Sequence, residues 1–452
     1  MEIKEFIQNN RQNMINDLAK IVSYNSVAEL DGKSQYPFGD INAKLLDETL
    51  KIFEREGLRT KNVDYYAGYG EIGEGDKLIG ILGHLDIVPC GKGWNSDPLT
   101  LTIRDEKIFG RGVTDDKGPV ICSLYAMKYL KESGVNLNKR IRLIAGCCEE
   151  RGSHCLHHYV EKEGHIDYGF TPDGSFPGIY GEKGGVGGTF SSINTKIKDI
   201  NGGLVANAVC NEVYAIFEIN SINEVKIKEY FDKNNVKYNF ERNEKDKLTV
   251  YGVAAHASTP HLGVNAIGHL FAALKYAGFE DDFVTYYNKH VGLLTDGSLF
   301  DSKIEDKYGA LTFNNGMIYM KDGHIEGTID IRVPVTYDTE VVVNKLKENF
   351  NDENGYLLNV NGGKPLFFDP ESPMVKALVD AYRDVTNDYE NQPMVIGGGT
   401  YSKGINNCIA FGPEYPGKDY HIHDIDEFLY ESELLEQTEI YIKAIQNLLK
   451  LD

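Results

Sequence analysis

The spacing of apolar residues predicts alternating helices and strands over the first 183 residues. A helix over 3–22 is predicted by apolar positions near helical spacing, namely Ile3, Ile7, Met14, Leu18 and Ile21. The apolar runs 78–82 and 141–146 are typical of buried strands, and Pro119 is expected to open a helix at its first position. Alternating elements of this kind indicate an α/β domain with a mostly parallel sheet covered on both faces.

The pattern changes at about residue 184, where Gly184, Gly185, Gly187 and Gly188 lead into a second set of elements. Helices are expected at 222–233, 262–277 and 337–350, and strands at 213–220, 247–253, 310–320, 324–333 and 356–360. This order resembles a β-α-β-β-α-β sandwich, with an extra loop at 281–309. The segment is therefore expected to be an α+β domain of its own.

The helix and strand texture of the first part resumes near Pro373 and ends in a helix over 432–449. A chain of 452 residues is long enough for two domains. We therefore expect a catalytic domain formed by 1–183 and 374–452, with a lid domain over 184–373 inserted into it. A second domain that simply follows the first is the alternative.

Charge and composition narrow the functional classes. The net charge of −21 argues against a nucleic-acid partner or an anionic membrane surface. The N-terminus has no apolar signal core, and no run approaches the roughly 20 apolar residues that a membrane helix needs. The seven cysteines are an odd number, mostly in apolar contexts, which favours reduced thiols and a cytoplasmic location.

Acids and histidines follow the predicted strands of the first domain. They are His84, Asp86, Asp115, Glu149, Glu150 and Asp173, together with His423 near the C-terminus. In open α/β sheets the ligand site lies beyond the carboxyl ends of the strands, so these side chains are expected to converge. Histidine with several carboxylates suits zinc, manganese or cobalt better than calcium. A shared carboxylate would let the set hold two ions, about 3.5–4 Å apart.

The adjacent acids Glu149 and Glu150 suggest a division of labour, in which Glu150 binds metal and Glu149 stays free as a base. Structural alternatives exist for each position taken alone. The two glutamates could be a solvated strand end, and Asp115 with Asp116 could cap a helix. Asp173 could be a turn residue and His423 a surface-loop residue. The coincidence of so many ligand types at strand ends favours the metal site.

Four segments resemble those of the M20 family of co-catalytic metallopeptidases. They are 83–86, 110–118, Glu149-Glu150 and 423–427. Within that family the chain is similar to the PepV- and carnosinase-like bacterial dipeptidases. The resemblance covers essentially the whole chain, including the inserted domain.

The resemblance implies a role for each ligand. One metal ion would be held by His84, Asp115 and Asp173, and the other by Asp115, Glu150 and His423. Asp115 would bridge the two ions, because the family motif places the bridge two residues before lysine. Asp86 would orient His84, and Glu149 would be the general base. The resemblance also suggests a cis peptide bond between Asp115 and Asp116.

Further residues are candidates for substrate contacts. His256, in the segment 252–258, resembles a lid histidine that steadies the tetrahedral oxyanion. Asn207, in the pattern Gly202-Gly203-x-x-x-Asn, is a candidate for positioning substrate. Arg332 can hold a substrate carboxylate in a two-pronged pair, and the backbone N–H groups of Gly397, Gly398, Gly399 and Thr400 offer donors for the same group. The structural alternatives are that His256 lies at the entry of a helix and that the glycine run 397–399 is a flexible turn.

Together these features predict a metallodipeptidase that hydrolyses dipeptides by a metal-bridged water, with two zinc or manganese ions per chain. The partner is a short peptide, and the chain is expected to be a monomer or a homodimer. An N-acyl amino acid deacylase of the deacetylase or desuccinylase type is the alternative within the same chemistry. A non-catalytic binder on the same fold would lack the base or a ligand, and this chain has both.

Overall fold

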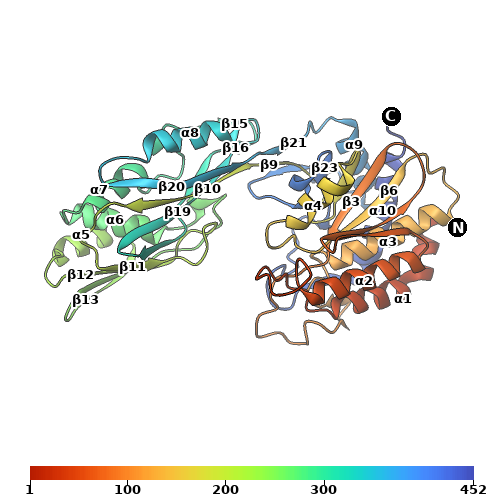
Figure 1. Ribbon diagram of the computed structural model, residues 1–452, viewed down its shortest axis with the longest axis horizontal. Coiled ribbons are helices and arrows are strands. Elements are labelled where there is room, and N and C mark those ends of the chain that lie inside the picture. The colour runs from red at the N-terminus through yellow and green to blue at the C-terminus, as the bar shows by residue number, and fades with distance from the viewer. The chain divides into compact units, whose positions relative to one another are not determined.

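A computed structural model describes residues 1–452, which form two compact units. The catalytic unit comprises 1–180, 368–394 and 399–452, and the inserted unit comprises 181–367 and 395–398 (Figure 1). The sequence placed the two boundaries at 183/184 and 373/374. The short segment 395–398 was not foreseen as part of the inserted unit. It comes from a distant part of the chain, so local patterning gives no sign of it.

The main sheet of the catalytic unit is parallel at its centre and antiparallel at its edges. Its strands are β1 (Arg59–Val63), β2 (Ala67–Ile72), β6 (Arg140–Gly146), β3 (Leu78–His84), β7 (Tyr168–Thr171), β23 (Cys408–Ala410) and β9 (Ile179–Glu182), in that spatial order. The four central strands β6, β3, β7 and β23 run parallel to one another, whereas β1 with β2, β2 with β6, and β9 with β23 pair antiparallel. The expected parallel sheet is therefore this central part, which carries the predicted ligands.

Helices cover both faces of this sheet. They are α1 (Ile3–Val22), α2 (Asp40–Arg55), α3 (Lys117–Glu132), α4 (His154–Glu163), α9 (Pro373–Thr386) and α10 (Glu431–Leu448). Gly83 of β3 lies against Val120 of α3, while Gly80 on the opposite face lies against Ile166, just after α4. Helix α3 begins at Lys117, two residues before the predicted start, because proline is tolerated throughout a first turn that lacks N–H partners.

The remaining elements of the catalytic unit are short. They are β4 (Thr102–Arg104), β5 (Lys107–Phe109) and β25 (Phe428–Tyr430) in one sheet, β8 (Gly174–Ser175) paired with β24 (Pro413–Glu414), and the 3-10 helix η3 (Tyr401–Gly404). Strand β25 pairs with β5, so the C-terminal segment that carries His423 is tied to the segment before Asp115.

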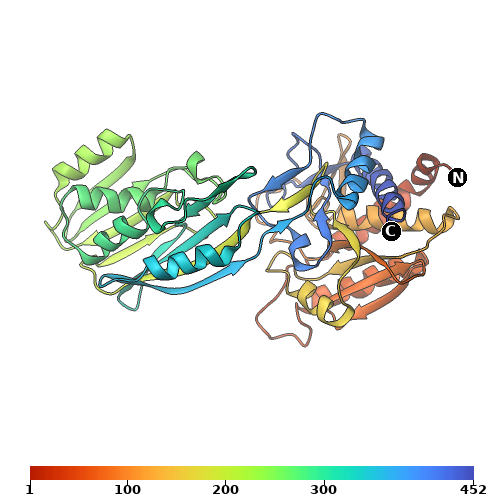
Figure 2. The same cartoon turned by 90° about the horizontal axis from the view of Figure 1, so that it is seen from above.

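The inserted unit is a second sheet, antiparallel throughout. Its order is β13 (Lys237–Arg242), β14 (Asp246–Tyr251), β12 (Glu212–Phe217), β11 (Asp199–Gly202), β18 (Ile318–Lys321), β19 (His324–Val333), β10 (Gly184–Ser192) and β20 (Gly355–Gly363), with β17 (Thr312–Asn314) also on β19. The helices are α5 (Glu224–Asn234), α6 (Ala266–Tyr276), α7 (Asp282–His290) and α8 (Thr339–Asn349), and they pack on this sheet (Figure 2). Minor elements are η1 (Pro260–Leu262), η2 (Ser298–Phe300), β15 (Glu305–Asp306) and β16 (Gly309–Ala310). Strands β21 (Leu366–Phe367) and β22 (Met394–Ile396) both pair with β9 and so extend the main sheet.

Two predicted segments of the inserted unit differ in detail. The segment 281–309, expected as a loop, contains α7, whose Phe283 and Tyr287 lie in the core of the unit. The strand expected over 310–320 is split into β17 and β18, and between them the backbone at Gly316 lies too close to the Ala206 carbonyl for a side chain. Strands β18 and β19 form a hairpin, as the two strands expected on either side of 321–323 suggest, and Asp322 and Gly323 form its two-residue turn with positive φ values.

Strand β19 shows how the sequence aligns polar side chains on one face. Burial alternates along the whole strand, and Ile329, Ile331 and Val333 enter the core. Side chains two residues apart share a face of a strand. Asp330 and Arg332 therefore lie together on the polar face, away from the core.

Candidate metal centre

Most of the predicted site residues of the catalytic unit, ligands and base alike, lie at the ends of neighbouring parallel strands. His84 is the last residue of β3, Glu149 and Glu150 follow β6, and Asp173 follows β7. Asp115 lies in the turn that leads into α3. Because the carboxyl ends of β6, β3 and β7 lie side by side, the sheet itself brings these residues together.

Asp115 lies between the two predicted histidine ligands. Its Oδ1 is 2.8 Å from Nε2 of His84, and its Oδ2 is 2.9 Å from Nε2 of His423. The same His423 nitrogen is 3.0 Å from Oε1 of Glu150. The peptide bond between Asp115 and Asp116 is cis, as expected. A carboxylate whose two oxygens face two separate imidazoles has the arrangement that a metal-bridging residue requires.

The donor atoms gather closely enough to fit divalent ions. Within two groups, one of His84, Glu149 and Asp173 and one of His84, Asp115 and Glu150, the ligand atoms all lie within 4.8 Å of one another. His423 joins the second group through its contacts with Asp115 and Glu150. Imidazole nitrogens with carboxylate oxygens are a donor set for zinc or manganese. The residues present therefore fit the two predicted ions.

Asp86 positions both His84 and the two adjacent glutamates, Glu149 and Glu150. The Nδ1 of His84 is 3.0 Å from the main-chain carbonyl of Asp86, which can only accept, so Nδ1 carries a proton and Nε2 faces Asp115. The buried Asp86 carboxylate accepts hydrogen bonds from the backbone N–H groups of Glu149 (2.9 Å) and Glu150 (3.1 Å). The sequence predicted the link to His84, but it did not reveal that Asp86 also fixes the two glutamates.

The surroundings shift the pKa values of two carboxyl groups, Glu149 and Asp115, in opposite directions. Burial, together with the charges of Asp115 and Glu150, raises the pKa of Glu149 to about 7. Burial opposes ionisation of Asp115 as well, but hydrogen bonds with His423 and His84 outweigh it and hold the pKa of that carboxyl well below its usual range. A carboxylate with a pKa near neutrality can both accept and return a proton.

Glu427 is a functional candidate that sequence reasoning left without a role. Its carboxylate is 1% exposed and accepts hydrogen bonds from Arg111 Nη1 (2.8 Å) and from the backbone N–H groups of Gly112 (3.0 Å), Thr114 (2.9 Å) and Asp115 (3.2 Å). It therefore fixes the turn that presents Asp115. The only sign in the sequence is its place in the segment 423–427.

The predicted residues of the inserted unit also come together. The backbone N–H of Ala257, beside His256, donates to the Asn207 carbonyl at 2.9 Å. Arg332 donates through Nη1 to the Gly397 carbonyl at 3.4 Å, and Gly397 lies against Ser258. Burial and the positive charge of Arg332 lower the pKa of His256. Asn207, His256, Arg332 and Gly397 thus form one cluster.

Two contacts in this cluster were not foreseen. Arg332 is paired with Asp330, which accepts from Nε at 2.7 Å and from Nη2 at 2.9 Å, so its guanidinium is held by a neighbour on β19. The backbone N–H of Ser258 donates to Nδ1 of His256 at 3.2 Å, and the Ser258 hydroxyl lies 2.7 Å from the same nitrogen. Nδ1 is therefore the acceptor of the neutral ring, and Nε2 carries the proton.

Gly399 and Thr400 belong to the catalytic unit. The Thr400 hydroxyl accepts from the Ser402 N–H at 3.3 Å and so begins η3. The next residue, Tyr401, is fully buried, and its ring meets that of His84 edge-on at 6.2 Å between centroids. The glycine turn thus ends directly behind His84.

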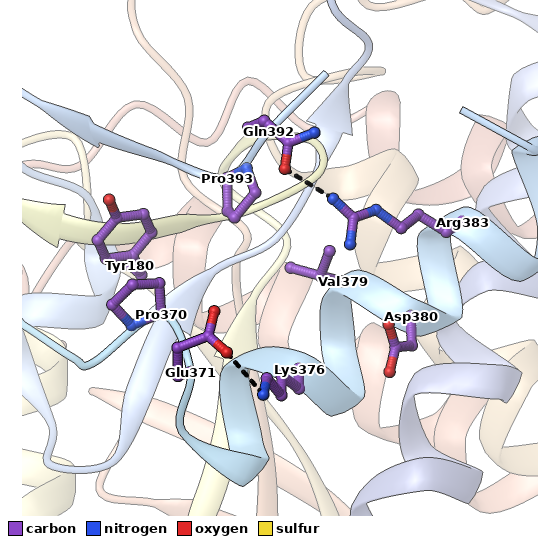
Figure 3. Close-up of a pocket in the computed structure, with 9 residues that line it drawn as sticks. All are labelled: Tyr180, Pro370, Glu371, Lys376, Val379, Asp380, Arg383, Gln392 and Pro393. Carbon is purple, nitrogen blue, oxygen red and sulfur yellow. Dashed lines mark hydrogen bonds and ion pairs between the residues drawn. The ribbon is translucent and has the colours of Figure 1, made fainter. Parts of the chain in front are cut away.

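A cavity of about 370 Å³ lies elsewhere in the catalytic unit, beside α9 (Figure 3). Three of its charged side chains have partners within the lining: Lys376 pairs with Glu371 at 2.7 Å, and Arg383 donates to Gln392 at 2.8 Å. None of the predicted site residues lines this cavity. The cluster around Asp115 is therefore the better candidate for the active site.

Residues 80–447 match the family described as Peptidase family M20/M25/M40. The chain belongs to this family. The family predicted from the motifs is confirmed, and the chain is an M20-type peptidase. No helix of this peptidase has both the length and the apolar character needed to cross a bilayer.

Similar proteins cover nearly its whole length. A Bacillus subtilis (strain 168) protein named "Putative dipeptidase YtjP" is 33% identical over 459 residues, covering 97% of this M20 peptidase and 98% of the relative. A Staphylococcus saprophyticus protein named "Putative dipeptidase SSP1012" is 34% identical over 460 residues, covering 96% and 97%.

Solved structures share the fold. Human carnosine dipeptidase 1 matches with a TM-score of 0.60 at 16% identity, covering 99% of this chain and 98% of that one. The aminopeptidase PepT of Bacillus cereus matches with a TM-score of 0.57 at 16% identity, covering 98% and 99%. These likenesses confirm the predicted two-domain α/β fold class.

Proposed function

We propose that this M20 peptidase is a metal-dependent dipeptidase with Glu149 as its general base. The observation that supports the proposal best is the Asp115 carboxylate, whose two oxygens face His84 and His423. Relatives named as dipeptidases match over almost the full length, which supports a dipeptide as the substrate.

The proposed metal ligands are those that the family resemblance implies, and the cluster supports them in that His84 lies close to Asp173 in one group of donor atoms and to Asp115 and Glu150 in the other. His84, Asp115 and Asp173 would hold one ion, and Asp115, Glu150 and His423 the other, with zinc or manganese as the ions that suit these donors. When bound, such ions polarise the scissile carbonyl and lower the pKa of the attacking water.

Glu149 would move the proton. Asp86 fixes its backbone, and its side chain lies among the ligand atoms of His84 and Asp173. The carboxylate would take a proton from the attacking water and return it to the leaving amine. His256, whose Nε2 carries the proton, would donate a hydrogen bond to the oxyanion of the substrate, with Asn207 beside it.

The substrate carboxylate would be held by Arg332 and the glycine turn. Asp330 engages Nε and Nη2 of Arg332, so the guanidinium is fixed and its Nη1 side remains directed toward Gly397. The backbone N–H groups of Gly397, Gly398, Gly399 and Thr400 are further donors for this carboxylate.

All seven cysteines are free and six are buried, which supports a reducing, cytoplasmic setting.

The proposal is tested by comparing Ala-Ala with N-acetyl-Ala-Ala and N-acetylalanine in the metal-loaded protein. We expect hydrolysis of Ala-Ala, and no turnover of the two acetylated compounds, with alanine release as the readout. Release of acetate from N-acetylalanine while Ala-Ala stays intact would overturn the dipeptidase and identify an N-acyl amino acid deacylase.

Glu427 should determine how tightly the metal centre binds. Glu427→Gln replaces an acceptor of three backbone N–H bonds by a group that is part donor, so the Asp115 turn loosens. Loss of such an outer partner typically lowers metal affinity by about 10–100-fold. Competition with a chelating dye measures the metal affinity of the parent protein and of the variant. Glu433→Gln, which changes another buried glutamate that pairs with Lys418, is the control and should keep the parent affinity. Equal losses in both variants would show that Glu427 has no special role.

A further inference from the structure

A short strand of the inserted unit, β17, lies beside the candidate substrate-binding residues without supplying one of them. In its antiparallel pairing with β19, Thr312 lies directly opposite Arg332. Two residues on, Asn314 lies opposite Asp330. Phe313, between them, belongs to the core of the unit. Because side chains alternate along a strand, Thr312 and Asn314 share the polar face of the sheet with Arg332.

Asn314 holds the chain on both sides of Asn207. The residue is 2% exposed, and its amide nitrogen donates to the Ala206 carbonyl at 3.0 Å and to the Ala208 carbonyl at 2.9 Å. Carbonyl oxygens only accept, so the amide presents both of its N–H donors to them. The Asn207 carbonyl, which lies between these two, accepts instead from the Ala257 N–H at 2.9 Å. Asn207 is therefore fixed through the backbone on either side of it.

Thr312 holds the chain next to His256. Its hydroxyl donates to the Ala257 carbonyl at 2.9 Å. Ala257 is fully buried, whereas the neighbouring His256 is exposed. An antiparallel bridge between Ala208 and His256 joins the two held segments to each other. The segments that carry Asn207 and His256 are thus both attached to β17.

Side chains are needed here because the two held segments are irregular. No helix or regular strand includes residues 203–211 or 252–259. Backbone groups outside regular structure still require hydrogen-bond partners where they are shielded from water. An apolar residue at position 314 would leave two carbonyls without donors, and an aspartate would set a carboxylate against them. Asparagine satisfies both carbonyls with one side chain.

We propose that Thr312 and Asn314 are positioning residues, which hold His256 and Asn207 in the arrangement that the reaction requires. The inference rests on the proposed dipeptidase function, in which His256 donates a hydrogen bond to the oxyanion of the substrate. That bond forms fully only in the transition state, so a displaced His256 lowers kcat and leaves KM nearly unchanged. Thr312 and Asn314 do not touch the substrate, and each acts through the segment that it holds.

Thr312→Val, which removes the hydroxyl and keeps nearly the same shape, tests the proposal through kinetics. We expect kcat for Ala-Ala to fall by roughly 10- to 100-fold, since a misplacement of about 1 Å can cost the larger factor. KM and metal affinity should stay at the parent values. In the His256→Ala background, Thr312→Val should have no further effect on kcat, because the group through which it acts is gone.

The matched control is Thr285→Val. It removes another hydroxyl of the inserted unit that donates to a backbone carbonyl, that of Asp281 at 3.1 Å, and it should keep the parent kcat. Asn314→Leu should lower kcat as well, and its effect should disappear in the Asn207→Ala background. If Asn314→Leu does not fold, Thr312→Val still decides the question.

Hydrogen exchange tests the same claim without catalytic activity. The Ala257 N–H, which donates to the Asn207 carbonyl, should exchange faster in Thr312→Val than in the parent protein, while α7 exchanges at the parent rate. An unchanged kcat in Thr312→Val, or an equal loss with and without His256, would overturn the proposal. If the parent protein hydrolyses no dipeptide, the proposed function has failed. Exchange at Ala257 then decides the positioning role, which an unchanged rate would overturn.

Discussion

Glu149→Gln should lower kcat for Ala-Ala by about 100-fold or more while metal content stays at the level of the parent protein. Removal of a general base typically costs at least that factor. The amide has nearly the shape of the carboxylate, so the backbone bonds from Glu149 and Glu150 to Asp86 are retained. Steady-state kinetics together with elemental analysis of the purified variant provides the measurement.

Its neighbour supplies the matched control. Glu150→Gln changes the adjacent residue, which contacts His423 at 3.0 Å and is proposed to bind metal. That variant should lose metal as well as activity. If Glu149→Gln keeps more than about a tenth of the parent kcat, the base has been assigned to the wrong residue.

Arg332→Ala should lower kcat/KM for Ala-Ala by about 10- to 150-fold, which corresponds to about 1.5–3 kcal/mol for hydrogen bonds to a charged group. The loss should be much smaller for Ala-Ala-amide and for Ala-Ala-Ala-Ala, because neither places a carboxylate one residue beyond the scissile bond. The parent protein should also prefer Ala-Ala over both.

The pairing of Arg332 with Asp330 refines this expectation. A longer peptide brings no carboxylate to Arg332, but it does not leave the arginine unpaired, because Asp330 already compensates its charge. The selectivity for dipeptides should therefore come from the donors that the carboxylate gains. Arg242→Ala, which removes another arginine of the inserted unit paired with an aspartate, Asp246, is the control and should change none of the three values. Equal losses for all three substrates in Arg332→Ala would rule out a carboxylate anchor.

The convergence of His84, Glu149 and Asp173 was predictable because it depends on local order. Each follows an apolar run typical of a buried strand, and neighbouring parallel strands end at one edge. The hairpin over Asp322 and Gly323 was likewise predictable, since positive φ at both positions suits those residues.

What the sequence did not show depends on contacts between distant segments. Glu427 meets Asp115 across more than three hundred residues, and no spacing rule connects them. The antiparallel edges of the main sheet arise from the pairing of β2 with β6, which hydrophobicity alone does not specify. Helix α7 was missed because Asp281 caps a short helix within a segment that looks polar and irregular.

The central claim is that two divalent ions bound by one cluster make this chain a dipeptidase. Protein stripped of metal with a chelator should be inactive on Ala-Ala. Adding back zinc or manganese should restore hydrolysis in step with binding, up to two ions per chain, and Asp115→Asn should prevent the restoration because both proposed sites share that residue. Full activity in the stripped protein, or full activity with Asp115→Asn, would contradict the account.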